Sequence, residues 1–257
     1  MLHWNIQSKL SVSLLVLSAS TWGSSQGTPP TIEYTASRGG SVKCLSEVNA
    51  AREAAGLPSF GEASGEQQLS DPGNSELEAD TEWRKLCEHL IPTQTEPVET
   101  AAAAKPFEQG TYAFKSLTAE EPNCKETVDY WKSAFKNFSG LPPSKSQAGG
   151  LYNSQDNVSF VALYNPSSDA TADCRVITCI KTTTPGEAVV NSDPQPSTEN
   201  GYAIICKTMP TAFTNNDSAP FTQDQWDGIA SSLTGSAAIV FPGFGVFLIT
   251  VLSMTAL

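Results

Sequence analysis

The sequence predicts an α+β protein in which a small antiparallel sheet lies between helices, as a three-layer α-β-α sandwich stapled by disulfides. Two observations predict this arrangement. Apolar residues recur at helical spacing as far as residue 138, and after Gly149 they recur at a period of two. Six cysteines lie between two apolar terminal segments, and an even number of cysteines in an exported chain is typical of a disulfide framework.

The N-terminal segment predicts export. Residues 1–24 have the pattern of a secretory signal peptide, because Lys9 precedes an apolar stretch and small residues follow it. Residues 25–40 are polar and contain paired prolines, so we expect a stalk or a disordered lead-in there. The folded domain is then expected over residues 41–230.

Helical spacing of apolar residues predicts three helices in the first half of the domain, over residues 41–55, 80–90 and 123–138. The triplet Gly56-Leu57-Pro58 is expected to end the first helix, with the glycine in the left-handed conformation. The same triplet at Gly140 is expected to end the third. Asn123 and Glu126 can cap the start of the third helix. Its apolar stripe comprises Val128, Trp131, Phe135 and Phe138.

Strands are expected in most of the second half of the domain. A first strand is expected over residues 111–117, after an exposed loop rich in Pro, Thr and Glu at residues 92–110. Three further strands joined by loops are expected to form an antiparallel meander, over residues 158–164, 173–182 and 202–209. Residues 221–233 form a closing amphipathic segment that carries Trp226 and Ile229.

The C-terminal segment predicts a lipid anchor. Residues 237–257 are apolar and uncharged, and they follow a short polar spacer and a group of small residues. That order is the signal for attachment of a glycosylphosphatidylinositol (GPI) lipid, after which the tail is removed. The predicted signal covers residues 231–257, and the alternatives are a true membrane span, which Pro242, Gly243 and Gly245 would interrupt, or a buried C-terminal helix. The candidate attachment residues are Gly228, Ala230, Ser231 and Ser232.

The cysteines are predicted to form three disulfides whose connectivity the sequence leaves open. They are Cys44, Cys87, Cys124, Cys174, Cys179 and Cys206. Cys174 and Cys179 are five residues apart on one predicted strand, so they face opposite sides of the sheet and cannot pair with each other. Each is expected to join its face to a covering helix or a neighbouring strand, which would link all three layers.

The chain is acidic, with a formal net charge of −12. Because nucleic-acid binding depends on clustered Lys and Arg, this charge argues against DNA or RNA as a partner. Three acceptor sequons are compatible with export. They begin at Asn137, Asn157 and Asn216.

Several segments resemble the GPI-anchored surface antigens of Eimeria, which are coccidian parasites. They are CLSEVNAAREAAGLPSF, WRKLC, DYWKSAFKNFSGLP, NVSFVALYNPSSDATADCRVITC and YAIICKTMP. That family in turn resembles the CAP superfamily of cysteine-rich secretory proteins, so the resemblance implies a CAP-like fold. It also implies a parasite surface antigen on the outer face of the plasma membrane, with a role in host-cell contact or attachment and in immune display.

The sequence departs from the CAP pattern at the metal cleft. Many CAP proteins hold a divalent metal with two histidines and two acids, whereas His89 is the single histidine of the expected mature region. We therefore expect no metal site, no cofactor and no catalytic residue. No nucleophile elbow or metalloprotease motif occurs. His89, beside Glu88 near the end of a predicted helix, is interpreted as a solvated residue that the helix dipole favours.

Two binding hypotheses follow. In the first, the domain is an adhesive module that touches a host-cell receptor or glycan: Lys125, Lys132 and Lys136 lie near one side of the third predicted helix and could meet anionic glycans or lipid headgroups. The alternative is a solvated face whose lysine stems cover apolar surface. In the second hypothesis the fold binds a lipid or sterol, as attributed to several CAP proteins. The groove would be lined by Phe107, Tyr112 and Phe114, which are otherwise ordinary core residues.

Overall fold

The computed structural model describes residues 28–93, 109–186 and 195–235. A single sheet is built from β1 (Thr31–Arg38), β2 (Gly61–Glu62), β3 (Thr111–Leu117), β4 (Thr171–Thr184) and β5 (Ser197–Met209). Its strand order is β1-β4-β5-β3, all antiparallel, and the two-residue β2 pairs in parallel with β4. The helices are α1 (Leu45–Ala54), α2 (Glu82–Leu90), α3 (Cys124–Lys132), α4 (Gln155–Leu163) and α5 (Gln223–Thr234). The 3-10 helices are Gly65–Gln67, Ser133–Asn137 and Leu151–Asn153. The predicted α+β class is confirmed.

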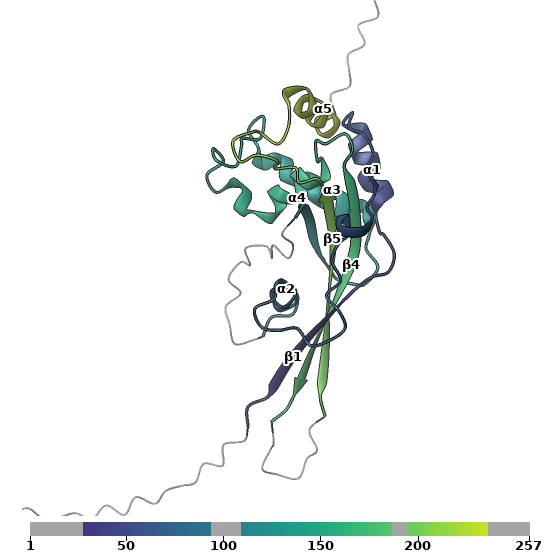
Figure 1. Ribbon diagram of the computed structural model, residues 1–257, viewed down its shortest axis with the longest axis vertical. Helices are drawn as coiled ribbons and strands as arrows, with labels where there is room; N and C mark the ends of the chain where they lie inside the picture. The colour runs from purple at the N-terminus through teal and green to yellow at the C-terminus, as the bar shows by residue number, and fades with distance from the viewer. Residues whose placement is uncertain (1–27, 94–108, 187–194, 236–257) are drawn as a thin grey trace, which may run out of the picture.

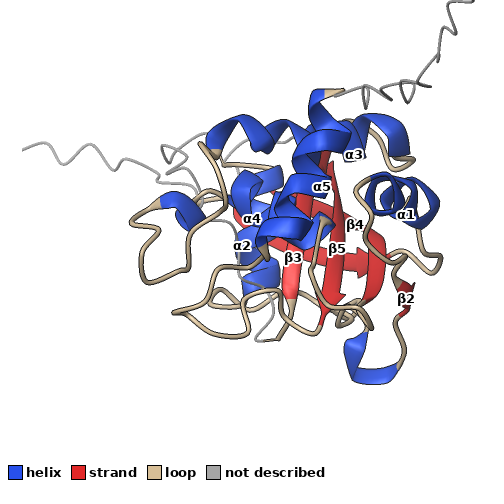
Figure 2. Cartoon of the chain, turned by 90° about the horizontal axis from the view of Figure 1, so that it is seen from above, coloured by secondary structure: helices blue, strands red, loops and turns tan. Residues whose placement is uncertain are grey.

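Helices lie on both faces of the sheet (Figures 1 and 2). The larger apolar core joins α1, α3, α4 and α5 to one face, where Cys174, Ile204 and Cys206 point. The smaller core joins α2 to the opposite face, where Ile177 and Ile205 point. Because successive strand residues alternate between faces, β4 and β5 are buried on both sides and are apolar on both.

The lead-in predicted for residues 25–40 is wrong over most of its described part, because residues 31–38 form β1. This strand pairs with β4 along its whole length, from Thr31 opposite Thr184 to Arg38 opposite Ile177. Tyr34 and Ala36 alternate into the smaller core and are almost fully buried. The folded domain therefore begins about ten residues before the predicted boundary at residue 41.

The strand predicted over residues 158–164 is also wrong, because these residues lie in and just after α4. Phe160, Val161, Ala162 and Leu163 are all almost completely buried. A helix that is enclosed on every side is apolar all round and carries no amphipathic signal. The predicted meander therefore reduces to the β4–β5 hairpin, with β3 on the outer side of β5.

Side chains of α3 and α4 close the β3 edge of the sheet. Trp131 Nε1 donates a 2.9 Å hydrogen bond to the Phe114 carbonyl, and Gln155 donates to the Tyr112 carbonyl at 2.8 Å. The Phe114 amide donates to Ser159 Oγ at 3.0 Å. Unpaired edge groups invite pairing with another chain, and here the helices satisfy several of them.

The other predicted helices are confirmed, with shorter bounds. Asn123 caps α3 as expected, since its side chain accepts a hydrogen bond from the Glu126 amide at 3.1 Å. Gly56 follows α1 with φ of +76°, which a glycine adopts readily. The matching expectation for Gly140 is wrong: α3 ends at Lys132 and continues as a 3-10 helix to Asn137. The predicted stripe of this segment packs into the larger core.

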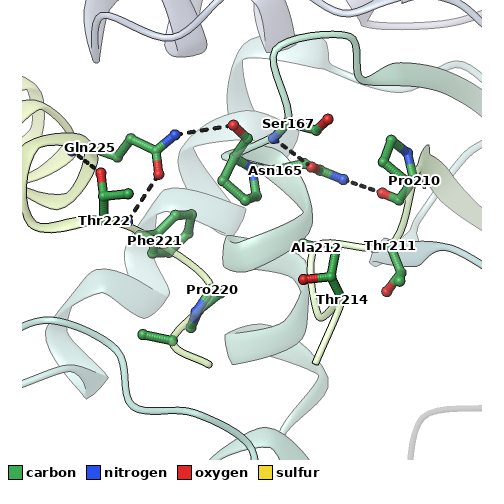
Figure 3. A pocket seen from close by; sticks show the side chains of 12 residues that line it. Asn165, Ser167, Pro210, Thr211, Ala212, Thr214, Pro220, Phe221, Thr222 and Gln225 are labelled. Carbon is green, nitrogen blue, oxygen red and sulfur yellow. Dashed lines mark hydrogen bonds between the residues drawn. The ribbon is translucent and has the colours of Figure 1, made fainter. Parts of the chain in front are cut away.

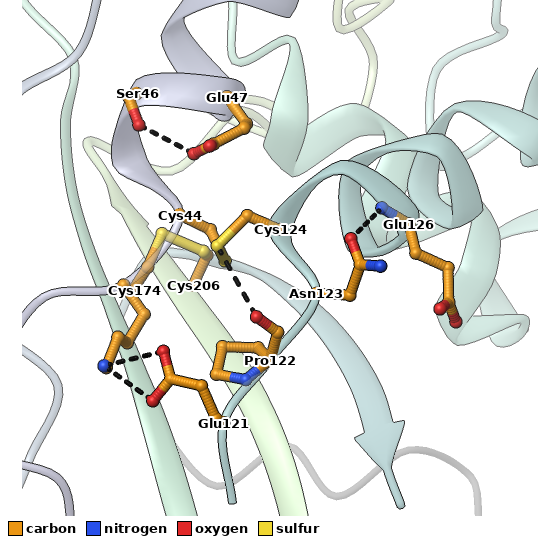
Figure 4. Close-up of a disulfide and its surroundings, with 11 residues drawn as sticks. Cys44, Ser46, Glu47, Glu121, Pro122, Asn123, Cys124, Glu126, Cys174 and Cys206 are labelled. Carbon is orange, nitrogen blue, oxygen red and sulfur yellow. Dashed lines mark hydrogen bonds and ion pairs between the residues drawn. A yellow bond between two sulfur atoms is a disulfide. The ribbon is translucent and has the colours of Figure 1, made fainter. Parts of the chain in front are cut away.

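All six cysteines form disulfides, in the pairs Cys44–Cys124, Cys87–Cys179 and Cys174–Cys206. Cys174 and Cys179 face opposite sides of β4, as predicted: the first is joined to the neighbouring strand β5 and the second to the covering helix α2. The remaining disulfide, Cys44–Cys124, joins the start of α1 to the start of α3 (Figure 4). It links two helices that cover the same face of the sheet. None of the three disulfides joins these helices to the sheet, so the expectation that disulfides link all three layers is wrong for the layer of α1 and α3.

A buried ionic cluster fixes the long connection between β2 and α2 to the sheet. Asp173 of β4 is almost fully buried and receives Arg175 Nε at 2.6 Å and the Leu69 amide at 2.8 Å. Arg38 Nη1 lies 3.9 Å from the same carboxylate and also donates to the Leu69 carbonyl. Lys207 donates to two carbonyls of the connection. Burial lowers the pKa of Lys207, and the charge of Asp173 opposes that effect.

The far ends of β1, β4 and β5 extend away from the helices as a three-stranded projection, which we call the β arm (Figure 1). It comprises residues 31–33, 180–184 and 197–200, which pair with one another beyond the last residue that β3 reaches. Most of its residues are exposed or half-buried. The β arm lies at the end of the molecule opposite α5 (Figure 1).

Candidate functional site

The candidate lipid-attachment residues lie in α5, which is part of the larger core. Thr222 and Gln225 form a capping box at its start, and Trp226 and Ile229 are buried. Gly228 approaches α1 so closely that an added Cβ would lie 2.4 Å from the Ala55 carbonyl oxygen. A glycine is required at this contact, and α5 therefore packs tightly against the end of α1.

The four candidates differ in how much of the core a cut would remove. A cut after Gly228 would separate Ile229, which has no exposed surface, from the domain. Loss of such a side chain from a core costs about 2–5 kcal/mol. Cuts after Ala230, Ser231 or Ser232 keep Ile229 and Trp226. The structure thus disfavours Gly228 and is compatible with the other three.

The charge of the predicted basic patch is reduced by one acid, Asp129. Lys125 Nζ lies 2.7 Å from Asp129, and Lys132 Nζ lies 3.8 Å from the other oxygen of the same carboxylate. The hydrogen bond from Lys125 lowers the pKa of Asp129. Lys136 is exposed on the 3-10 helix that follows. The three lysines share one side of this segment, but their combined charge is reduced by the carboxylate between two of them.

The three sequons differ in accessibility. Asn216 is exposed in the loop between β5 and α5, where a glycan would meet solvent. Asn137 is exposed as a residue, and its side chain donates to Asn157 at 2.7 Å. Asn157 is buried in α4 and its amide donates to the Leu151 carbonyl at 2.7 Å. The prediction of a glycan at Asn157 is therefore incompatible with this fold.

A pocket of about 360 Å³ opens between the loop after α4 and the segment that joins β5 to α5 (Figure 3). Its polar groups are used by the chain itself. The fully buried Asn165 donates to the Pro210 carbonyl at 2.7 Å, and Gln225 donates to the Pro166 carbonyl at 3.0 Å. These bonds hold the two loops and the start of α5 together, and the residues that line the pocket include serine and threonine hydroxyls but no His, Cys, Asp, Glu or Lys.

The aromatic residues proposed for a lipid groove do not line that pocket. Tyr112 and Phe114 pack against the smaller core, between the sheet and α2. Burial raises the pKa of Tyr112, whose hydroxyl donates to the Gln109 carbonyl. Phe107 lies outside the described residues. The interpretation of Tyr112 and Phe114 as core residues is the one that their packing favours.

A family model for the sporozoite surface antigen (SAG) protein domain matches residues 40–248. This match covers most of the chain. The chain belongs to the SAG family. Membership in this family indicates a protein of the parasite cell surface, and surface antigens of this kind are generally non-catalytic.

The SAG chain is also similar to the sporulated oocyst TA4 antigen of Eimeria tenella. The two are 28% identical over 234 residues, which cover 84% of this chain and 87% of the relative. The resemblance to Eimeria surface antigens is thereby confirmed. No solved structure matches the chain, so the further likeness to CAP proteins stays a prediction.

The SAG domain offers no metal cluster in the part that the structure describes. Groups of three or more His, Cys, Asp or Glu side chains in a suitable arrangement are absent there. His89 lies in the last turn of α2 with its ring 6.0 Å from that of Phe114. Its Nδ1 is buried and has no hydrogen-bond partner among the described residues. His89 thus packs one side of its ring against an aromatic residue and is half-buried, so the expectation of a solvated residue holds only in part.

The membrane-related predictions fall largely outside the described residues. The signal peptide at residues 1–24 and the apolar tail at 237–257 are not described. Among the helices that are described, none combines the length and the apolar character needed to cross a bilayer.

The sequence analysis also missed two fully buried polar residues, Arg52 and Tyr164.

Proposed function

We propose that this SAG protein is a GPI-anchored surface antigen that is held at the membrane by its α5 end and presents the β arm to the host cell. The observation that carries the proposal is that α5 and the β arm lie at opposite ends of the molecule (Figure 1). The predicted attachment signal, residues 231–257, begins within α5. An anchor there leaves the β arm as the part farthest from the bilayer.

The packing of α5 on the core supports this orientation. Ile229 and Trp226 hold the helix to the core close to the attachment point. A lipid joined to such a helix restrains the whole domain and not merely a loose stalk.

The β arm has the character of a polar contact surface. Thr31, Glu33 and residues 197–200 are exposed. Its one close ion pair, in the part of the arm that is described, joins the buried Lys181 to Glu199 at 2.8 Å. Exposed, polar, mutually paired strands can present side chains to a partner without requiring a large apolar patch. We propose that this surface contacts a host receptor or glycan.

The proposed fold is a CAP-like three-layer sandwich without the metal chemistry of that superfamily. Helices on both faces of the sheet support the layer order. Three disulfides support function outside the cell, where such bonds persist. The same framework suits immune display, because it keeps the exposed loops on a stable scaffold. We propose no cofactor, no catalysis and no nucleic-acid partner.

A glycan placed on the β arm is expected to abolish host-cell binding, whereas one placed on the lysine patch is not. The double substitution Thr31→Asn with Glu33→Thr creates the sequon Asn-Ile-Thr on exposed arm positions. The matched control Lys125→Asn creates Asn-Glu-Thr at a side chain that is 86% exposed. Each glycan is first verified by its mass, and then binding of displaying cells to host cells is counted.

The steric bulk of a glycan blocks a partner wherever it covers the contact, so the two variants compare two surfaces directly. We expect at least a tenfold loss of bound cells for the arm variant, on the order of 1.4 kcal/mol, and little change for the control. Loss of binding in the control alone would assign the contact to the lysines and contradict the proposed orientation.

A further inference from the structure

Arg52 is a buried cation with no anion beside it in the part of the chain that the structure describes. It lies in α1 with no exposed surface. Its Nε donates to the Pro58 carbonyl at 2.8 Å, and its Nη1 donates to the carbonyls of Leu163 and Asn165 at 3.2 and 2.9 Å. Nη2 has no hydrogen-bond partner among the described residues, and the guanidinium takes part in none of their ion pairs.

Such a group is costly, because removal from water disfavours its charged form. Burial lowers the pKa of Arg52 to about 10. The face of the Phe60 ring, 3.7 Å from the guanidinium carbon, supplies a partial compensation. A buried charge of this kind is normally paired. The fold therefore contains a pre-formed guanidinium in which one nitrogen, Nη2, has no acceptor among the described residues.

A second unsatisfied group lies next to it. Tyr164 follows α4 and has no exposed surface, and its hydroxyl makes no hydrogen bond of good geometry within the described residues, where the Ser232 side chain is a polar group that approaches it. Burial raises the pKa of Tyr164, while the Ser232 side chain and the charge of Arg52 each offset part of this rise. Both Arg52 and Ser232 are therefore close to the same hydroxyl. Arg52 Nη1 donates to the carbonyls of Leu163 and Asn165, on either side of Tyr164, so the guanidinium and this hydroxyl are neighbours, and Ser232 of α5 lies close to the hydroxyl.

GPI attachment would replace that last turn. The amine of an ethanolamine phosphate attacks the carbonyl of the attachment residue, the peptide bond to the next residue breaks, and the released tail leaves with its own amine. The chain of atoms from the carbonyl carbon to phosphorus is N, C, C, O, P. The chain from the same carbon to the second downstream Cα is N, Cα, C, N, Cα. An ethanolamine that follows the path of the helix therefore carries its phosphorus to the place of that Cα.

We propose that Arg52 and Tyr164 bind the phosphate of the anchor's ethanolamine phosphate, with attachment at Ala230. Attachment at Ala230 puts the phosphorus at the place of the Ser232 Cα, near the Tyr164 hydroxyl and the neighbouring guanidinium. Removal of residues 231–234 takes the Ser232 side chain away from this hydroxyl, and the phosphate oxygens accept from Nη2 and from the tyrosine hydroxyl. This inference rests on the proposed GPI anchor. It makes the bridging phosphate a structural part of the mature domain.

The other candidate residues do not give this match. Attachment at Ser231 or Ser232 would carry the phosphorus to the places of Leu233 or Thr234, farther along α5. Ala230 is also the candidate that is followed by two further small residues, Ser231 and Ser232, which the attachment signal requires. Ile229, with no exposed surface, stays in the mature domain.

The test uses the full chain expressed on cells and released with phosphatidylinositol-specific phospholipase C. Mass spectrometry of the C-terminal peptide is expected to show Ala230 carrying ethanolamine phosphate. In the phosphorus NMR spectrum of the released protein, the bridging phosphate is expected to give a broad, immobilised signal. The cyclic phosphate that the lipase leaves on inositol gives a sharp internal reference. Tyr164→Phe is expected to narrow the bridging signal and to lower the Tm by several degrees.

The control is Tyr152→Phe, which removes a hydroxyl that donates to the Pro143 carbonyl and is expected to leave the bridging signal broad. Without a bound phosphate, Tyr164→Phe removes only an unsatisfied buried hydroxyl, and the Tm would stay or rise. A mobile bridging phosphate on an anchored protein would overturn this inference alone. A protein without ethanolamine would overturn the anchor as well, and attachment at another residue would overturn the assigned geometry.

Discussion

Replacing Asp173 by asparagine is expected to lower the free energy of unfolding by about 3–5 kcal/mol, because the buried cations around it lose their carboxylate. Arg175 Nε lies 2.6 Å from one oxygen of Asp173, and Arg38 Nη1 lies 3.9 Å from the other. Lys207, opposite Asp173 on β5, is almost buried as well. Asparagine keeps the shape and an acceptor for the Leu69 amide but leaves these charges unbalanced. Chemical denaturation of the released protein measures the loss.

The matched control for Asp173 is Asp71→Asn. Asp71 also pairs with Arg38, at 3.8 Å, but its side chain is 61% exposed. An exposed pair contributes at most about 1 kcal/mol, so this variant is expected to remain close to the wild type. Equal losses in the two variants would show that burial of the Asp173 charge has no special importance.

A local readout is available for the same comparison. The connection over residues 61–82 carries several glutamates and no Lys or Arg, so a glutamate-specific protease can cut it and trypsin cannot. The Asp173 carboxylate and the Arg38 and Lys207 side chains hold this connection at residues 66–69. Asp173→Asn should therefore speed its cleavage, whereas Asp71→Asn should not.

Removing the disulfide between α2 and β4 is expected to have the second large effect. The pair Cys87–Cys179 closes 92 residues, and in the chain-entropy model such a loop contributes about 4.6 kcal/mol. The double substitution Cys87→Ala with Cys179→Ala removes it. The matched control removes Cys174–Cys206, which closes 32 residues within the hairpin and contributes about 3.7 kcal/mol in the same model.

Both double variants are compared with the wild type by thermal and chemical unfolding. The variant without Cys87–Cys179 should lose more free energy of unfolding, since α2 covers the smaller core and this disulfide is what joins α2 to the sheet. A larger loss on removal of Cys174–Cys206 would contradict the assignment of α2 as a covalently held layer.

The helices that face a single core could be predicted from sequence. Trp226 and Ile229 mark the buried side of α5, and both are buried as expected. Asn123 caps α3 because a short polar side chain can reach the free amides of the first turn. These features are local, and a single-chain pattern contains them.

The two elements that were wrongly predicted depend on the rest of the fold. The run Val158–Tyr164 is apolar apart from Ser159, and periodicity alone cannot separate a fully buried helix from a strand. Only the packing of α4 between β3, α3 and the remaining core decides it. For β1, the alternation of Ile32, Tyr34 and Ala36 was present, but the prolines just before it favoured a loop.

The candidate site was predictable only in part. The small residues of α5 were recognisable, because the attachment signal is a linear pattern. Arg52 and Tyr164 carried no such signal: the arginine lies beside the apolar stripe of α1, and the tyrosine ends an apolar run. Their proximity follows from the packing of α1, α4 and α5. Disulfide pairing was open for the same reason, since it depends on how distant segments meet.

Release by phosphatidylinositol-specific phospholipase C tests the central claim most directly. Intact cells that express the full chain are treated with the enzyme, and the supernatant is assayed for the protein and its C-terminal peptide. The account predicts release of a protein that lacks residues 231–257 and carries ethanolamine. Retention on the cells, while a known GPI-anchored protein is released in parallel, would contradict the anchor and the orientation that follows from it.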